Sequence, residues 1–159
     1  MQMTPRRPPA DRADTGFSLT ELMVVCAILG ILATASIPFF LRYYQSAALK
    51  AATEELAVFL NQGRQVAIKE NQPVCVHTSS GSIHFHINGC SGTTWRGPGT
   101  DASGNLKIPT GFTLTNTADP IFSYLGAAAP AATYTVRNSR DNRTLTVTVA
   151  ASGRVTIGP

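Results

Sequence analysis

One carboxylate lies where an ionised side chain is costly. Glu21 directly precedes residues 22–41, a run of twenty uncharged residues that is long enough to cross the hydrocarbon core of a bilayer. An ionised carboxylate beside hydrocarbon costs several kcal/mol unless a cation pairs with it. Glu21 could lie among lipid headgroups, or it could be neutralised by a cation of another chain. The second interpretation makes Glu21 an assembly residue.

The cysteines and histidines beyond this run could form a disulfide or a metal site. Cys75 and Cys90 flank a short predicted hairpin, and a bond between them would contribute about 3 kcal/mol in the chain-entropy model. A turn centred on residues 80–81 would place Cys75 on one face with three imidazoles, whereas a one-residue slip would separate them. No CxxC or HExxH spacing supports zinc, so we expect a disulfide, no metal, and three exposed histidines: His77, His84 and His86.

Four arginines in the last strands could contact phosphate. Arg137, Arg140 and Arg143 surround one predicted hairpin tip, and Arg154 should lie roughly 20 Å away at about 3.3 Å per strand residue. Clustered, exposed cations are what DNA binding requires. A solvated basic edge that discourages strand-to-strand aggregation would have the same composition. The residues alone leave both interpretations open.

Enzymatic activity is not expected. The chain has no P-loop, no GxSxG elbow and no HExxH motif. Outside residues 1–16 its acids form no evident pair for acid–base chemistry. We therefore predict no catalytic residue and no cofactor. These acids are Glu21, Glu54, Glu55, Glu70, Asp101, Asp119 and Asp141.

The apolar run should be the first half of one long helix. Residues 17–41 form the expected transmembrane half, and residues 42–72 contain the amphipathic half and its end. Because Pro38 cannot donate to the carbonyl four residues earlier, we expect a kink or a melted turn there, with Gly30 a second interruption. Beyond residue 41, apolar residues recur at steps of three and four: Leu49, Ala52, Leu56, Phe59 or Leu60, Gly63, and Val66 or Ala67.

Residues 73–159 should form a β-rich head. Their alternating apolar and Thr- or Ser-rich texture predicts short strands that pack on the helix as an antiparallel sheet or β-sandwich, giving an α+β fold. Residues 90–104 have the composition of a loop. The predicted strands are 74–77, 83–87, 111–115, 121–124, 133–137, 144–150 and 154–157.

Composition and charge are consistent with one domain and an anchor. The chain has 159 residues, of which 43% are hydrophobic and only 14% charged, with a net charge of +4. This composition excludes an intrinsically disordered protein. Residues 1–16 carry three arginines, which should hold that end in the cytoplasm. A cleaved secretory signal would need a small-residue site after the apolar run, and residues 37–41 provide none.

The start of the apolar run resembles the type III signal of type IV pilins and type II secretion pseudopilins. The matching residues are Gly16-Phe17-Ser18-Leu19-Thr20-Glu21. The resemblance implies that residues 1–16 are a leader, that a prepilin peptidase cuts between Gly16 and Phe17, and that the new amine of Phe17 is methylated. It also implies that Glu21 of one subunit neutralises that ammonium in a neighbour. Two charges that are each costly alone become tolerable as a pair, which favours assembly.

The second half of the chain resembles the GspH/FimT group of minor pseudopilins. This resemblance implies a β-sandwich head at or near the tip of a pseudopilus or pilus, and in some members a basic C-terminal region that binds DNA. The DNA-binding members carry Gly-Arg-x-Arg, whereas residues 153–156 here lack the second arginine. The matching residues are Val74-Cys75, Cys90, Trp95-Arg96-Gly97, Ile108-Pro109-Thr110-Gly111 and Ser152-Gly153-Arg154-Val155.

These observations predict a minor pilin or pseudopilin. The subunit should be stored in the bacterial inner membrane as a single-pass protein, with its N-terminus cytoplasmic and its head periplasmic, and then join a type IV pilus or a type II secretion pseudopilus. Its expected partners are other pilins, the prepilin peptidase and inner-membrane lipid. The alternative function is that of a DNA-binding minor pilin in natural transformation.

Overall fold

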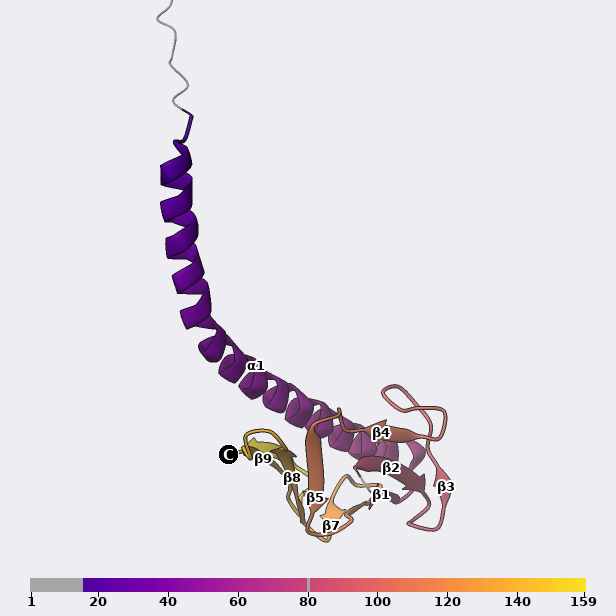
Figure 1. Cartoon of the computed structure of the whole chain (residues 1–159). Helices are drawn as coiled ribbons and strands as arrows, with labels where there is room; N and C mark the ends of the chain where they lie inside the picture. The colour runs from indigo at the N-terminus through magenta and orange to yellow at the C-terminus, as the bar shows by residue number, and fades with distance from the viewer. Residues whose placement is uncertain (1–15, 80) are drawn as a thin grey trace, which may run out of the picture. The chain divides into compact units, whose positions relative to one another are not determined.

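The computed structural model describes residues 16–79 and 81–159 and divides into two compact units that meet between Leu41 and Arg42 (Figure 1). Residues 1–15 of the predicted leader 1–16 lie outside the described residues. The first unit ends with the apolar half of a long helix. The second contains the rest of this helix and all of the strands.

Helix α1 spans Leu19–Glu70 and is continuous through both Gly30 and Pro38. Within the described residues, it is the one helix long and apolar enough to cross a membrane. Its first half buries no side chain. The alternative of a melted turn at Pro38 is wrong, because the helix is continuous there, whereas a kink at Pro38 or Gly30 stays a prediction. The helix starts two residues later than predicted, with the carbonyl of Ser18 accepting the first hydrogen bonds.

The second half of α1 buries the predicted apolar stripe. Every position expected on that stripe is buried, and Thr53 and Ala57 lie on the same face. The buried hydroxyl of Thr53 donates to the carbonyl of Leu49, 2.8 Å away, so its burial leaves no polar group unpaired. The helix ends where predicted, because Asn71 adopts the left-handed conformation (φ 52°) and Pro73 follows.

The first sheet is antiparallel, with strand order β3-β2-β1-β6-β7, and β4 also pairs with β2. β1 and β2 form a hairpin in which Ser79 pairs with Ser82, so the turn is centred as predicted. The strands are β1 Val74–Ser79, β2 Ser82–Ile87, β3 Thr93–Thr94, β4 Asn105–Lys107, β6 Ile121–Phe122 and β7 Ala128–Ala129.

The second sheet is a four-stranded antiparallel sheet with strand order β10-β9-β8-β5. Its central hairpin joins β8 to β9 with Arg137 opposite Thr144, so the arginine-rich turn projects from the end of this sheet. The strands are β5 Phe112–Asn116, β8 Ala132–Asn138, β9 Thr144–Val149 and β10 Val155–Gly158.

The strand predictions need three corrections. β3 lies within the segment 90–104 that was predicted as a loop, and β4 and β7 were not predicted. β6 ends at Phe122, so Tyr124 lies in a turn, where the amide of Gly126 donates to the carbonyl of Ser123. The predicted α+β class is confirmed, because antiparallel sheets pack on the inner face of α1.

One core joins the helix to both sheets. Phe59 of α1 stacks on Phe85 of β2 with ring centroids 4.2 Å apart, and Trp95 packs on the same ring at 5.7 Å. Gly63 faces this ring so closely that an added Cβ would lie 2.8 Å from it. From the second sheet, β8 and β9 contribute Tyr134, Val136, Val147 and Val149, all fully buried.

Candidate functional site

The N-terminal end of α1 presents the predicted processing and assembly residues to solvent. Phe17 precedes the helix and is 80% exposed, and nothing crowds Gly16. Glu21 lies in the first helical turn, where the partial positive charge of the helix end favours a carboxylate. Among the described residues no cation lies within ion-pair distance of Glu21. Its charge is therefore available to another molecule.

The apolar half of α1 exposes large hydrophobic side chains on all sides. Its few polar groups are satisfied within the helix, since the hydroxyls of Thr34 and Ser36 donate to the carbonyls of Ile31 and Leu32. Beyond Glu21, this half of the helix presents no unsatisfied polar group to its surroundings and suits lipid or other apolar helices. The exposed side chains include Leu22, Met23, Val24, Val25, Ile28, Leu29, Ile31, Leu32, Ile37, Phe39, Phe40 and Leu41.

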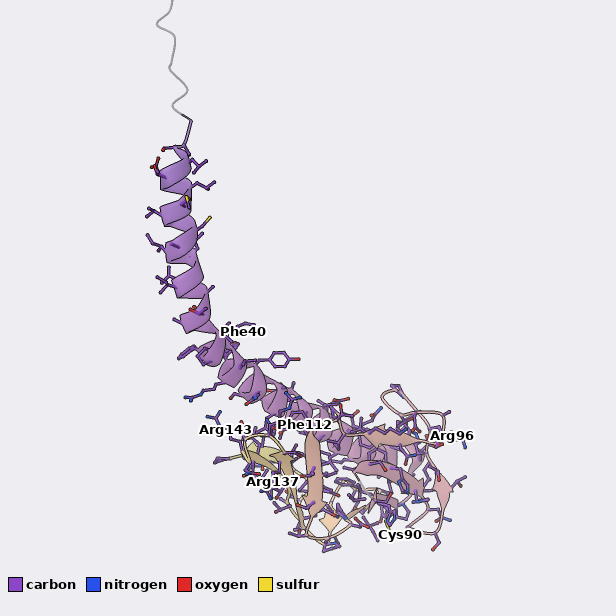
Figure 2. The ribbon with its side chains drawn as sticks, viewed as in Figure 1. Phe40, Cys90, Arg96, Phe112, Arg137 and Arg143 are labelled. Carbon is purple, nitrogen blue, oxygen red and sulfur yellow. A yellow bond between two sulfur atoms is a disulfide. The ribbon has the colours of Figure 1, made fainter. Side chains whose placement is uncertain are left out.

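The predicted disulfide is present. Cys75 on β1 and Cys90, which follows β2 and is labelled in Figure 2, are joined across a sequence separation of 15 residues. Cys75 is fully buried, and its strand pairs with both β2 and β6. The bond therefore ties the loop after β2 to the middle of the first sheet.

The three histidines share one face of the β1–β2 hairpin, as the centred turn predicts. The expectation that all three are exposed is wrong, because His84 and His86 are half-buried and His77 alone is exposed. His77 pairs with His84 across the strands, and the ring centroids of His84 and His86 are 4.9 Å apart. Nδ1 of His77 lies 3.0 Å from the Asp119 carboxylate. Burial of the ring, followed by repulsion from His86 and His77, lowers the pKa of His84. Within the described residues these side chains do not form a group placed to hold a metal ion.

The arginines separate into a cluster and an outlier. Arg137 donates to Asn142 Oδ1 at 2.7 Å, and Nε of Arg143 lies 3.7 Å from the Asp141 carboxylate. Arg140 lies in the β8–β9 turn, Arg137 lies near the end of β8 and Arg143 directly precedes β9, and all three are exposed. Arg154 lies at the other end of β9, before β10. The structure therefore brings three of the four predicted phosphate-binding residues together.

The turn of this hairpin packs beside the beginning of the head's helix, an arrangement that sequence reasoning missed. Arg143 lines one groove with Tyr43 and Lys50. On the other side of the hairpin, Arg140 lines a second groove with Tyr44. Part of this arrangement could have been noticed in the sequence, since tyrosines and cations directly follow the apolar run. The approach of residues 140–143 to them, however, is a result of the fold.

Two family models match the chain. Residues 11–37 match the prokaryotic N-terminal methylation motif, and residues 52–153 match the type II transport protein GspH. The first match contains Gly16, Phe17 and Glu21, and the second covers most of the head. No curated protein matches the chain.

Solved structures share its fold. The type IV minor pilin FimU of Pseudomonas aeruginosa is 16% identical, with a TM-score of 0.56 over 74% of this chain and 92% of that one. The minor pseudopilin EpsH of Vibrio cholerae is 12% identical, with a TM-score of 0.55 over 69% and 94%. GspH of Escherichia coli is 13% identical, with a TM-score of 0.56 over 70% and 87%.

Proposed function

Because the chain belongs to the GspH family of type II transport proteins, we propose that it is cut after Gly16, held in the inner membrane and then built into a fibre at or near its tip. At the level of the family, it is a minor pilin or pseudopilin of a type IV pilus or a type II secretion system. Members of this kind are structural subunits that pack with other pilins, and they are not enzymes.

The proposed processing requires that a peptidase reach the bond between Gly16 and Phe17. The methylation motif spans this bond, and both residues precede the first turn of α1. A segment outside regular structure can extend into a protease without breaking helical hydrogen bonds. This supports the proposal that a prepilin peptidase cuts this chain between Gly16 and Phe17 and also methylates the new amine of Phe17.

The proposed assembly contact pairs Glu21 with the N-terminal amine of a neighbouring subunit. The single observation that carries it is that Glu21 begins an apolar helix without an ion-pair partner among the described residues. Cleavage creates an ammonium at Phe17, at the same edge of the apolar segment. Since a charge at hydrocarbon is costly alone, pairing between subunits lowers the free energy of the assembled state relative to the stored one.

The proposed topology puts residues 1–16 in the cytoplasm and residues 73–159 in the periplasm. Three arginines precede the apolar run, and cations beside a membrane helix favour the cytoplasmic side. The disulfide is consistent with a head in an oxidising compartment. The position at or near the tip is supported by the resemblance to the GspH/FimT group.

Substitutions at two positions test the processing and the assembly separately. Gly16→Val should leave the leader attached, so the purified protein should begin at Met1 instead of Phe17. Glu21→Ala and Glu21→Val should be cleaved and remain membrane-bound, but should be depleted from sheared fibres. Glu55→Ala, which removes an exposed carboxylate farther along the same helix, is the matched control. Normal fibre incorporation of both Glu21 variants would refute the pairing argument.

DNA binding is the second candidate function, and the exposed cluster of Arg137, Arg140 and Arg143 favours it. The distant Arg154 adds little to that cluster, which limits the phosphate contacts to one hairpin end. The full chain in a neutral detergent should shift duplex DNA at micromolar concentration, and the shift should weaken steeply with salt. Absence of such a shift would exclude this function.

A further inference from the structure

We propose that the turn of the β8–β9 hairpin and the adjoining turns of α1 form a binding surface for the anionic headgroups of membrane lipids. We call this set the headgroup surface: Arg42, Tyr43, Lys50, Arg140 and Arg143. The inference rests on the proposed storage of the subunit in the inner membrane. It assigns a lipid partner to the β8–β9 hairpin, in addition to the apolar helix that is proposed to cross the membrane.

Chain connectivity keeps the headgroup surface near the bilayer. Tyr43 follows the last apolar residue, Leu41, by about 3 Å along the helix and Lys50 follows it by about 14 Å, at 1.5 Å per residue. These path lengths are upper limits on the distance from the end of the hydrocarbon segment, whatever the orientation of the two units. The headgroup layer of each leaflet is about 5–7 Å thick. Lys50 and the helix residues before it therefore lie in this layer or within one Debye length of it, about 8 Å in physiological salt.

The hairpin reaches this level although it lies about a hundred residues later in the chain. Arg143 shares a groove with Tyr43 and Lys50, and Arg140 shares one with Tyr44. Figure 2 shows Arg143 beside α1 and Arg137 farther from the helix. Two arginines of the hairpin are thereby added to the cations at the beginning of the helix in the second unit.

The headgroup surface has four cations and no acid of its own, although carboxylates lie beside two of these cations. Arg143 lies 3.7 Å from the Asp141 carboxylate, and Lys50 lies 3.8 Å from the Glu54 carboxylate. Both pairs are at least partly exposed to solvent and therefore weak, so they leave Arg143 and Lys50 free to exchange partners. The first acids along the helix are Glu54 and Glu55, about 20 Å beyond Leu41. Glu55 does line the groove of Arg140, but at its end farther from Leu41.

Two tyrosines complete an interfacial pattern. Tyr43 is 70% exposed and Tyr44 is 64% exposed, unlike the buried Tyr134 of the core. A ring with an apolar body and a hydroxyl is favoured at the boundary between hydrocarbon and water. Exposed tyrosines beside exposed cations are the composition of a lipid interface. Arg154, by contrast, lies at the opposite end of β9.

The test uses the full chain in bilayers and a fluorophore on the hairpin. Cys26 is the free cysteine among the described residues, so a Cys26→Ala background lets Ser139→Cys carry the label while the disulfide stays intact. A nitroxide attached to the lipid headgroup quenches the fluorophore when the turn is docked. Quenching should be greater when phosphatidylglycerol is mixed into phosphatidylcholine, and it should fall with added salt.

The charge variants identify the residues responsible. Arg140→Gln and Arg143→Gln should each lower the docked-to-free ratio in phosphatidylglycerol bilayers about fivefold. Arg154→Gln, the matched control on the same sheet, should leave the ratio unchanged. The fluorescence of Trp95 verifies that each variant is folded. If a variant does not fold, the dependence of quenching on salt and on phosphatidylglycerol, measured with all arginines present, still tests the proposal.

Three results would overturn the proposal. Quenching that is independent of lipid charge would refute the contact with anionic headgroups. An effect of Arg154→Gln equal to that of Arg143→Gln would show that the contact is not specific to the headgroup surface. Protection of the label by duplex DNA, with no response to phosphatidylglycerol, would assign the arginines to DNA instead. Because unassembled subunits are used, failure of fibre assembly leaves this test intact, and a chain that does not enter bilayers would refute the proposed storage first.

Discussion

Gly63→Ala should destabilise the head, although alanine is the better helix former. Gly63 is buried on the inner face of α1, and a Cβ at this position would lie 2.8 Å from both Cε1 and Cζ of Phe85. That is roughly 1 Å inside the usual 3.5–4.0 Å contact between carbons. The ring has little room to retreat, because Phe59 stacks on it at 4.2 Å and Trp95 packs against it.

The expected change in the free energy of unfolding follows from two opposing contributions. Overpacking a well-packed core costs about 1–3 kcal/mol, and replacing glycine by alanine in a helix returns up to about 1 kcal/mol. Two ring atoms are contacted and the ring is fully buried, so the steric cost belongs in the upper part of its range. We therefore expect Gly63→Ala to lower the free energy of unfolding by about 1–2 kcal/mol.

A double-mutant cycle isolates the contact. Phe85→Leu removes the ring edge, so in that background Gly63→Ala should be neutral or stabilising, with a coupling energy of about 2 kcal/mol. Denaturant unfolding in detergent can be followed by Trp95, the one tryptophan in the chain, which packs on Phe85. If Gly63→Ala stabilises the protein equally in both backgrounds, the argument that the helix approaches β2 too closely for a side chain is wrong.

Three further predictions can be checked by the same unfolding measurement. Replacing Cys75 and Cys90 together by serine should lower stability by about 3 kcal/mol in the chain-entropy model, and an unchanged midpoint would refute this. The lowered pKa of His84 means that the unfolded chain takes up its proton first, so the stability present above pH 6.5 should fall as the pH drops through the lowered value. His84→Gln should reduce that fall, and identical pH profiles would contradict the stated cause. Asn71→Val should cost about 1 kcal/mol because a β-branched residue is strained at φ 52°, whereas Asn71→Gly should be close to neutral.

Elements with a long repeating pattern were predictable from the sequence. The helix end at Glu70 followed from the residues after it, and β8 and β9 lie within one residue of their predicted bounds because their alternation extends over six or seven residues. β3, β4 and β7 have two or three residues each, too few for any period to appear. These short segments are strands because each forms hydrogen bonds with a neighbouring strand, as β4 does with β2. Which segments become neighbours depends on the whole fold and not on the local sequence.

The candidate sites likewise contain features that could be predicted from the local sequence and features that depend on the fold. The face shared by Cys75 and the histidines could be derived, since a centred turn determines which side chains lie opposite one another. The clustering of Arg140 and Arg143 also followed from their common turn. That this turn packs beside Tyr43 and Lys50 could not be derived, because the contact depends on how the second sheet lies along α1.

The Cys75–Cys90 bond sets an order of events for the proposed topology. Thiols remain reduced in the cytosol, so the link across 15 residues can close only after the head has crossed the membrane. A newly made subunit would thus carry a loosely held first sheet until an oxidant reaches it. Cells short of thiol oxidase should accumulate immature heads open to proteolysis, and fibre output would then depend on the redox supply outside the cytosol.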